Sequence, residues 1–213
     1  MLRAEDVLKE LQKRYERRER TEDPFYTLIF TILSQRTRDE QTEKATRRLF
    51  ERYGSAAEMA EAEVEDIEQL IRGVGFYREK ARRVKEVAGI IRDDGGVPDT
   101  FEGLLKLPGV GRKTANCVLL YGYGVNALPV DTHVHRVSNR LGLVTTKTPE
   151  ETEAALKALL PEDLWGYVND LFIAFGRDVC RPVGPRCGSC PFAADCRYYS
   201  ERAISSPARP SSS

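Results

Sequence analysis

Four cysteines near its C-terminal end constrain what this chain of 213 residues can fold into more than any other sequence feature. Cys180, Cys187, Cys190 and Cys196 follow the spacing C-x6-C-x2-C-x5-C, and the prolines and glycines between them favour a loop that wraps around a small object. Four thiolates in one loop suit a Zn²⁺ ion or an iron–sulfur cluster, and the softness of sulfur does not decide between the two. The fifth cysteine, Cys117, lies in an apolar helical run, and we expect it to be a small core residue.

Disulfide bonds are a poor explanation for these cysteines, because the chain has the features of a cytoplasmic protein. Its N-terminus becomes charged at Arg3 and lacks the apolar core of a signal peptide. Apolar runs such as residues 28–30 are far shorter than the roughly 18 residues of a membrane span. We therefore expect a cytoplasmic protein, nucleoid-associated in a prokaryote, that does not bind membranes and whose thiols stay reduced.

Apolar residues recur at helical spacing through nearly all of the chain before residue 180, first in residues 2–11 and then in residues 25–33. No segment alternates apolar and polar residues for long enough to require a strand. Further helices are expected over 38–53, 64–72, 78–93, 112–121, 132–141, 150–159 and 163–179. We predict an all-α fold with a disordered tail over 203–213, a segment rich in serine and proline.

Charge is balanced over the whole chain but not along it. The 33 lysines and arginines match the 33 aspartates and glutamates. Residues 56–70 carry six acids and no base, residues 72–92 carry seven bases and two acids, and residues 149–170 are acidic again. Zero net charge argues against a uniformly basic coat for nucleic acid. A local basic surface can still bind phosphates, because counterion release depends on local charge.

A turn with two glycines, LPGVGRKTA over residues 107–115, joins two of the expected helices. Glycine allows close approach of the backbone, and the unpaired N–H groups that start the second helix can hold a phosphate together with the helix dipole. The glycine-to-lysine spacing of a P-loop is missing. The glycines alone would be explained best by an ordinary helix–helix turn, so the functional argument depends on the lysine.

Lys113 stands in the first turn of that second helix, where the dipole disfavours a positive charge. A neutral amine is what nucleophilic attack or Schiff-base formation requires. Asp131 precedes the helical segment 132–141 and is expected to cap it. Near Lys113, its carboxylate could also assist proton transfer or stabilise positive charge on a sugar. His133 and His135 stand two positions apart and are not expected to share a metal.

The hairpin, the segment VDTHVHRV over 130–137 and the cysteine loop together resemble the endonuclease III family of helix-hairpin-helix DNA glycosylases, in the family's order. The resemblance implies two helical lobes with a DNA-binding groove between them. One would be a six-helix lobe over 19–126, and the other a discontinuous lobe over 1–18 and 127–202 that holds a structural [4Fe–4S] cluster on the four cysteines.

The same resemblance implies the activity. The protein would be a bifunctional DNA N-glycosylase and abasic-site lyase that removes damaged, mainly oxidised, pyrimidines from duplex DNA in base excision repair. Because a base inside a duplex cannot be reached, the nucleotide must be flipped out, at a cost of roughly a few kcal/mol. Lys113 would attack C1′ and form an imine, Asp131 would be its essential partner, and β-elimination would cut the strand. We expect a monomer whose partner is duplex DNA with a damaged base or an abasic site.

Two loops are implied to fill the gap left by the flipped base. The family usually has glutamine where this chain has Arg36, and Gln35 stands one place earlier. Arg36 could offer two donors to a guanine or could contact a phosphate. Phe76 lies in a loop that resembles the family's wedge-bearing loop, and it could stack in the gap or be a core aromatic. The other expected DNA contacts are Gly109, Gly111 and Arg112 of the hairpin and the cluster-loop arginines Arg181, Arg186 and Arg197.

Three alternatives stay open on the sequence. A mismatch-directed thymine or uracil glycosylase of the same fold is the nearest rival, because Arg36 is atypical. A non-catalytic, structure-specific DNA-binding protein would need neither Lys113 nor Asp131. A zinc-stapled interaction protein would carry stoichiometric zinc and lack the brown colour of a cluster near 400 nm.

Overall fold

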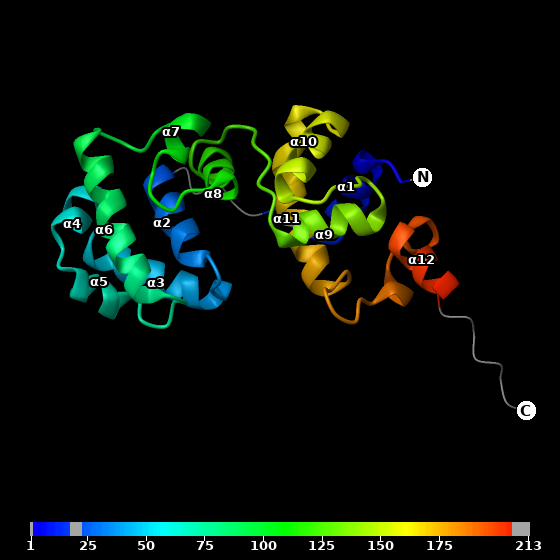
Figure 1. Cartoon of the computed structure of the whole chain (residues 1–213), viewed down its shortest axis with the longest axis horizontal. Coiled ribbons are helices and arrows are strands. Elements are labelled where there is room, and N and C mark those ends of the chain that lie inside the picture. The colour runs from blue at the N-terminus through cyan, green and yellow to red at the C-terminus, as the bar shows by residue number, and fades with distance from the viewer. Residues whose placement is uncertain (1, 18–22, 206–213) are drawn as a thin grey trace, which may run out of the picture. The chain divides into compact units, whose positions relative to one another are not determined.

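The computed structural model of the protein describes residues 2–17 and 23–205, and Figure 1 shows the course of the chain. These residues form helices joined by loops, with no β-strand among them. The prediction of an all-α fold is therefore confirmed. None of the described helices is long and apolar enough to cross a lipid bilayer. The chain divides into two compact units, Glu19–Pro129 and Met1–Arg18 together with Val130–Ser213.

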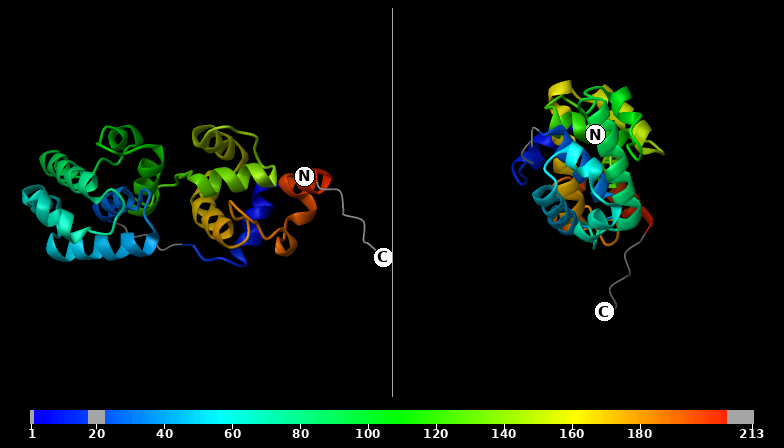
Figure 2. Two further views of the ribbon diagram at one scale, coloured as in Figure 1. Left: turned by 60° about the horizontal axis from the view of Figure 1, so that its bottom comes forward. Right: turned by 90° about the vertical axis from the view of Figure 1, so that its left-hand side faces the viewer.

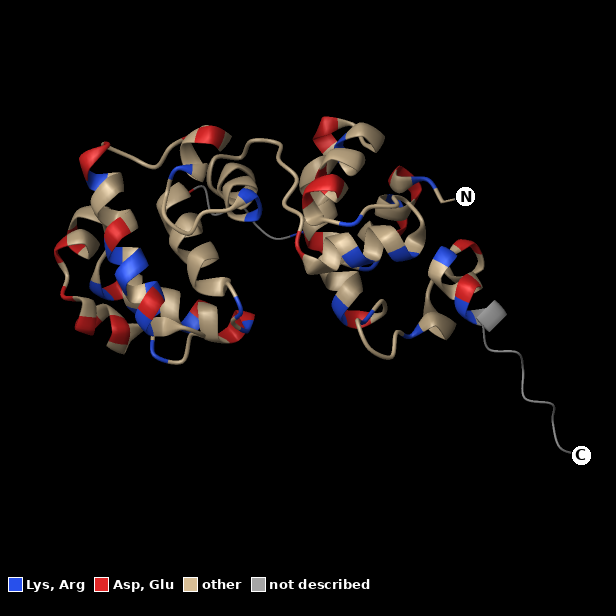
Figure 3. Cartoon of the chain, viewed as in Figure 1, with Lys and Arg blue, Asp and Glu red and all other residues tan. Residues whose placement is uncertain are grey.

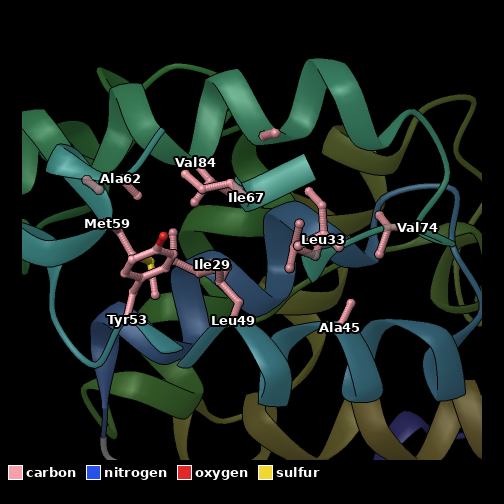
Figure 4. Packing of buried hydrophobic residues seen from close by; sticks show 13 residues of the cluster. Ile29, Leu33, Ala45, Leu49, Tyr53, Met59, Ala62, Ile67, Val74 and Val84 are labelled. Carbon is pink, nitrogen blue, oxygen red and sulfur yellow. The ribbon is translucent and has the colours of Figure 1, made fainter. Parts of the chain in front are cut away.

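The unit Glu19–Pro129, which we call the hairpin unit, is built around helix α2. Its elements are α2 Pro24–Ser34, α3 Asp39–Arg52, α4 Ala56–Glu61, α5 Val64–Leu70, α6 Tyr77–Asp93, α7 Phe101–Leu105, α8 Arg112–Cys117 and the π-helical turn η1 Val118–Gly122. Helix α2 is apolar on several sides because it serves two cores. Ile29 and Leu33 pack among side chains of α3, α4, α5 and α6 (Figure 4). Leu28 and Ile32 pack among side chains of α6, α7 and α8.

Side-chain caps fix where several of these helices begin. Asp23 accepts a hydrogen bond from the Tyr26 N–H at 2.9 Å, and Pro24 fills the first turn of α2. Thr100 caps α7 by accepting from the Gly103 N–H at 3.2 Å. Each cap satisfies a backbone donor that the helix itself leaves unpaired, and is worth about 1 kcal/mol. The cap on α7 defines the start of the hairpin motif.

The second unit, which we call the cysteine unit, contains the chain's first and last described helices. Its elements are α1 Ala4–Gln12, α9 Thr132–Leu141, α10 Pro149–Leu159, η2 Glu162–Leu164, α11 Trp165–Asp178, η3 Cys187–Ser189, η4 Ala193–Asp195 and α12 Arg197–Ser205. Helix α1 buries Val7, Leu8 and Leu11 and packs against α11, which in turn packs against α9. Helix α12 lies beside α9 (Figure 2).

Two sequence predictions need correction. The helix expected over 112–121 is α8 followed by the wider turn η1, which brings Gly122 against Pro24, where an added Cβ would lie 2.7 Å from the Pro24 Cα. Helix α12 extends to Ser205 and so occupies the first three residues of the expected tail 203–213. Its first turn is closed by the Ser200 N–H, which donates to the Cys196 carbonyl at 3.1 Å, and the helix packs on α9. The rest of the expected tail, 206–213, lies outside the described residues.

Candidate functional site

The turn between α7 and α8 depends on glycine at one position. Gly109 has φ +74°, in the left-handed region, and an added Cβ would lie 2.3 Å from Cδ of Arg83. Leu107 and Val110 are buried, and the Val110 N–H donates to the Leu107 carbonyl at 3.1 Å, which closes the turn. Gly111 then precedes α8 with open space where a Cβ would stand, and no described side chain caps the helix. An incoming acceptor therefore meets no side chain at this position.

Lys113 lies in the first turn of α8 and is half-buried, with the buried residues Thr114, Ala115, Asn116 and Cys117 behind it. Among residues 23–129, no group forms a hydrogen bond or ion pair with its ammonium. The helix thus fixes the backbone of Lys113 and leaves its amine available for chemistry. Cys117 is buried, as the sequence predicts.

Asp131 is the N-cap of α9, as expected from its position. Its Oδ1 accepts hydrogen bonds from the backbone N–H groups of His133 and Val134, both at 2.8 Å. Because both bonds use one oxygen, the cap leaves Oδ2 for another role. The side chain is half-buried, at the start of a helix in the cysteine unit.

The two histidines of α9 have separate partners. His133 Nδ1 lies 3.1 Å from the Arg136 guanidinium, whereas His135 Nδ1 lies 2.7 Å from the Thr152 hydroxyl.

Arg36 and Phe76 are brought together at the tips of two loops of the hairpin unit. The Arg36 guanidinium lies 5.7 Å from the centroid of the Phe76 ring, a cation–π distance. Phe76 is 61% exposed, so the alternative that it is a core aromatic is wrong. Arg36 has φ 53° and Phe76 has φ 58°, and no other non-glycine residue of the described chain has a positive φ. A left-handed backbone costs a non-glycine residue about 1–3 kcal/mol, and such strain is concentrated at functional sites.

A buried lysine fastens these two loops to each other. Lys80 of α6 is only 6% exposed, and its ammonium donates to the Leu33 carbonyl at 2.8 Å, to the Gln35 carbonyl and to the Thr37 hydroxyl at 3.1 Å. The Thr37 hydroxyl also accepts from the Gly75 N–H at 3.1 Å. Burial lowers the pKa of Lys80 to about 8. Sequence reasoning counted Lys80 only as one base in a basic run.

Three further side chains expected to contact DNA, those of Gln35, Arg112 and Arg186, each have a partner within the protein. The Gln35 amide donates to the Gly109 carbonyl at 3.1 Å, so this side chain braces the hairpin. Arg112 is exposed, with its guanidinium 4.7 Å from the centroid of the Phe101 ring. Arg186 is exposed and donates to the Asp178 carboxylate at 3.4 Å.

The other two cluster-loop arginines bind backbone carbonyls. Arg181 donates to the carbonyls of Arg177 and Asp178 at 3.2 and 3.1 Å. Arg197 donates to the Asn139 carbonyl at 2.7 Å. Part of the donor capacity of each is therefore used inside the cysteine unit.

The cysteine loop runs from the end of α11 to the start of α12. Cys196 is buried and the other three are half-buried. Burial raises the pKa of the Cys190 thiol, the Phe192 backbone N–H lowers it, and the charges of Cys196, Cys180 and Cys187 raise it. No three His, Cys, Asp or Glu side chains of the described residues are arranged to share a single metal ion.

Helix α9 holds this loop through Arg140, which sequence reasoning missed. Its guanidinium donates to the carbonyls of Arg181 at 2.6 Å and Pro182 at 3.0 Å, and lies 3.9 Å from Cys180 Sγ. The Cys196 thiol in turn donates to the Arg140 carbonyl at 3.2 Å. Helix α9, which Asp131 caps, therefore contacts both ends of the cysteine loop.

Acidic and basic segments of the hairpin unit are neighbours. In Figure 3 the ribbon of α4 and α5 is coloured for acidic residues, and that of α6 for residues of both signs of charge. Helices α4 and α5 pack against α6, and Arg78 lies 3.9 Å from Glu68 of α5. Within α6, Arg83 pairs with Glu79 at 3.0 Å. The basic run of 72–92 is thus partly neutralised by acids beside it.

Comparison with known proteins places the chain in a family. Residues 29–162 match the model of the HhH-GPD superfamily base excision DNA repair proteins. Endonuclease III of Thermotoga maritima is 54% identical over 200 residues, which are 93% of this chain and 94% of that protein. Endonuclease III of Bacillus subtilis is 37% identical over 183 residues, 84% of each chain.

Solved structures give the same answer. A trapped endonuclease III–DNA covalent intermediate matches with a TM-score of 0.86 and 37% identity, over 95% of this chain and 99% of that one. A thermostable thymine-DNA glycosylase matches with a TM-score of 0.81 and 26% identity, over 92% of this chain and 94% of that one. On its sequence, its helical fold and its hairpin, the chain belongs to the endonuclease III family, within the HhH-GPD superfamily of base excision DNA repair proteins.

Proposed function

We propose that this DNA glycosylase and abasic-site lyase removes oxidised pyrimidines from duplex DNA, with Lys113 as the nucleophile. The observation that supports the proposal most is the Lys113 ammonium, which is half-buried in the first turn of α8 and without a partner among residues 23–129. A lysine that serves only to stabilise the fold would be expected to have an acceptor. A trapped covalent complex with DNA is described for a relative of 37% identity, which fits a lysine nucleophile.

The chemistry follows from the amine. Neutral Lys113 attacks C1′ of the flipped nucleotide, an Nζ–C1′ bond forms, and the glycosidic bond breaks as the base leaves with its electron pair and gains a proton. The sugar ring opens to give an imine between Lys113 and C1′. Loss of a 2′ proton then expels the 3′ phosphate, which cuts the strand by β-elimination. We assign to Asp131 the transfer of protons in these steps through Oδ2, which its helix cap leaves free.

Arg36 and Phe76 are proposed to occupy the duplex where the nucleotide has left. Phe76 is exposed, and its apolar ring suits insertion between base steps. The guanidinium beside it can donate two hydrogen bonds to the edge of the opposite base. The two loops would therefore sense the opposite base, whereas Lys113 would act on the damaged strand.

A [4Fe–4S] cluster is proposed on Cys180, Cys187, Cys190 and Cys196. The support for it is the donor set itself, because four thiols in one loop suit a soft metal centre. When bound, the cluster would cross-link the loop and hold Arg186 toward the phosphate backbone. Absorbance near 400 nm with about four irons per chain supports the cluster, whereas stoichiometric zinc without colour contradicts it.

A mismatch-directed thymine glycosylase is the second candidate, favoured by the 26% identical thymine-DNA glycosylase structure and by Arg36 in place of the usual glutamine. A panel of duplexes carrying thymine glycol, uracil, mismatched thymine or an abasic site separates the two. The proposal expects cleavage at thymine glycol and at the abasic site. Base release confined to uracil or mismatched thymine, without strand cleavage, would favour the rival, and no reaction at all would favour a binding protein.

With DNA as its partner, the protein is proposed to act in the cytoplasm beside the chromosome.

A further inference from the structure

The acceptors around Lys80 come from one short segment. All three oxygens belong to residues 33–37, the end of α2 and the loop that carries Arg36. Among the described residues no carboxylate forms an ion pair with this ammonium, and Glu79, its neighbour in the sequence, pairs instead with Arg83 at 3.0 Å. Burying an ammonium without a paired carboxylate destabilises the fold, and the hydrogen bonds to this loop offset that cost. Lys80 therefore stabilises this loop rather than the hydrophobic core.

The loop needs such support because its conformation is strained. The carbonyls in the last turn of α2 receive no hydrogen bond from a backbone N–H of the same helix. Lys80 donates to that of Leu33 and to the Gln35 carbonyl just beyond the helix, which places a positive charge at the negative end of the helix dipole. The next residue, Arg36, has φ 53°. Fixing the carbonyls on either side of Ser34 holds the chain in the turn that Arg36 completes.

The support reaches the second loop as well. Thr37 accepts hydrogen bonds from Lys80 and from the Gly75 N–H through one hydroxyl. An added Cβ on Gly75 would lie 2.7 Å from the Arg36 carbonyl, so the two loops touch at the backbone. Phe76 follows directly, with φ 58° and its ring under the Arg36 guanidinium. One ammonium thus fixes the relative position of both exposed side chains.

We infer that Lys80 is a positioning residue that sets discrimination of the opposite base by clamping the Arg36 loop against the Phe76 loop. The inference rests on the proposed role of these loops, and it extends that role to a side chain that touches no DNA. Its signature is a loss of selectivity among opposite bases, which a general loss of stability would not produce.

The test uses full-length protein and duplexes with a tetrahydrofuran abasic-site analogue opposite each of the four bases, with affinity measured by fluorescence anisotropy. This readout needs no cleavage, so it stays informative if the proposed chemistry is wrong. The matched control is Lys85→Met. Lys85 lies on the same helix and donates to the Ala62 carbonyl at 2.7 Å, away from both loops. We expect Lys80→Met to lower the ratio between the tightest and weakest opposite base by about tenfold, and Lys85→Met to keep the wild-type ratio.

Two further variants keep the test informative if Lys80→Met does not fold. Thr37→Val removes the shared hydroxyl at nearly constant volume, and Gly75→Ala forces the loops apart at their backbone contact. Both are expected to lower the ratio as Lys80→Met does, and Lys80→Met in an Arg36→Gln background is expected to lower it no further. Equal weakening at all four bases with an unchanged ratio would overturn the inference, as would a wild-type protein that binds all four equally. Absence of lesion cleavage would instead count against the proposed function.

Discussion

The guanidinium of Arg36 lies 5.7 Å from the ring centroid of Phe76, and both residues have a left-handed backbone. Hydrogen bonds from the buried ammonium of Lys80 and to the Thr37 hydroxyl hold the two loops in this arrangement. Two strained residues that meet at exposed loop tips are better explained by contact with a ligand than by stability, because each costs about 1–3 kcal/mol.

Arg36 is predicted to select the opposite base. If its two donors read a guanine, Arg36→Gln should remove about 1–3 kcal/mol of preference for that base, because a glutamine amide matches adenine instead. Single-turnover cleavage of one lesion opposite each of the four bases measures this. The same order and spread of rates in wild type and variant would assign Arg36 to a phosphate contact.

The two hairpin glycines are predicted to fail in different ways. Gly111 has open space at its Cβ position, so Gly111→Ala should keep the wild-type thermal stability but bind abasic duplex about tenfold more weakly, because a methyl group would stand before the approaching phosphate. Gly109 has φ +74°, so Gly109→Ala should also lower the free energy of unfolding by about 1–2 kcal/mol. Melting curves and anisotropy titrations give both quantities. Full affinity in Gly111→Ala would remove the hairpin from the DNA interface.

Asp131 is predicted to have two separable roles. Asparagine caps helices as well as aspartate does, so Asp131→Asn should keep the hydrogen bonds to His133 and Val134 but lose the charge. Asp131→Ala should lose both and unfold about 1 kcal/mol more easily than Asp131→Asn. If both variants lose lyase activity alike while differing in stability, the carboxylate acts in the reaction. Wild-type activity in Asp131→Asn would leave capping as its role.

Lys80 is predicted to make the stability depend on pH. Burial lowers its pKa from the ordinary 10.5 to about 8, so between these values the unfolded chain binds more protons than the folded one. The free energy of unfolding of wild type, relative to Lys80→Met, should therefore rise with pH from about 8, by at most about 1.4 kcal/mol per pH unit. Urea unfolding of both proteins between pH 7 and about 9.5 measures the difference, because groups other than Lys80 titrate in both proteins and their contributions cancel. A difference that is flat or falls over this interval contradicts the low pKa.

The local features of this molecule were predictable from the sequence, because caps, glycine turns and helical periodicity act over a few residues. Asp131 as an N-cap and the turn at Gly109 are examples. The wider turn η1 was not, since it depends on the packing of Gly122 against the distant Pro24.

The role of Lys80 was not predictable from the sequence. Helical spacing places it four residues before Val84 and seven before Val87, on the buried face of α6, so a signal was present. Its partners lie 43 to 47 positions away in the chain, and no local pattern names them. Likewise Gln35 binds the Gly109 carbonyl 74 positions away, a contact that its neighbours in the sequence do not reveal.

The central claim is that Lys113 forms a covalent imine with DNA, and borohydride trapping tests it most directly. Wild-type protein incubated with a thymine glycol or abasic duplex and borohydride should give a stable protein–DNA adduct, and peptide mapping should place it on Lys113. Lys113→Gln should give none, whereas the control Lys106→Gln, at an exposed hairpin lysine, should trap as wild type does. An adduct of undiminished yield in Lys113→Gln would contradict the account.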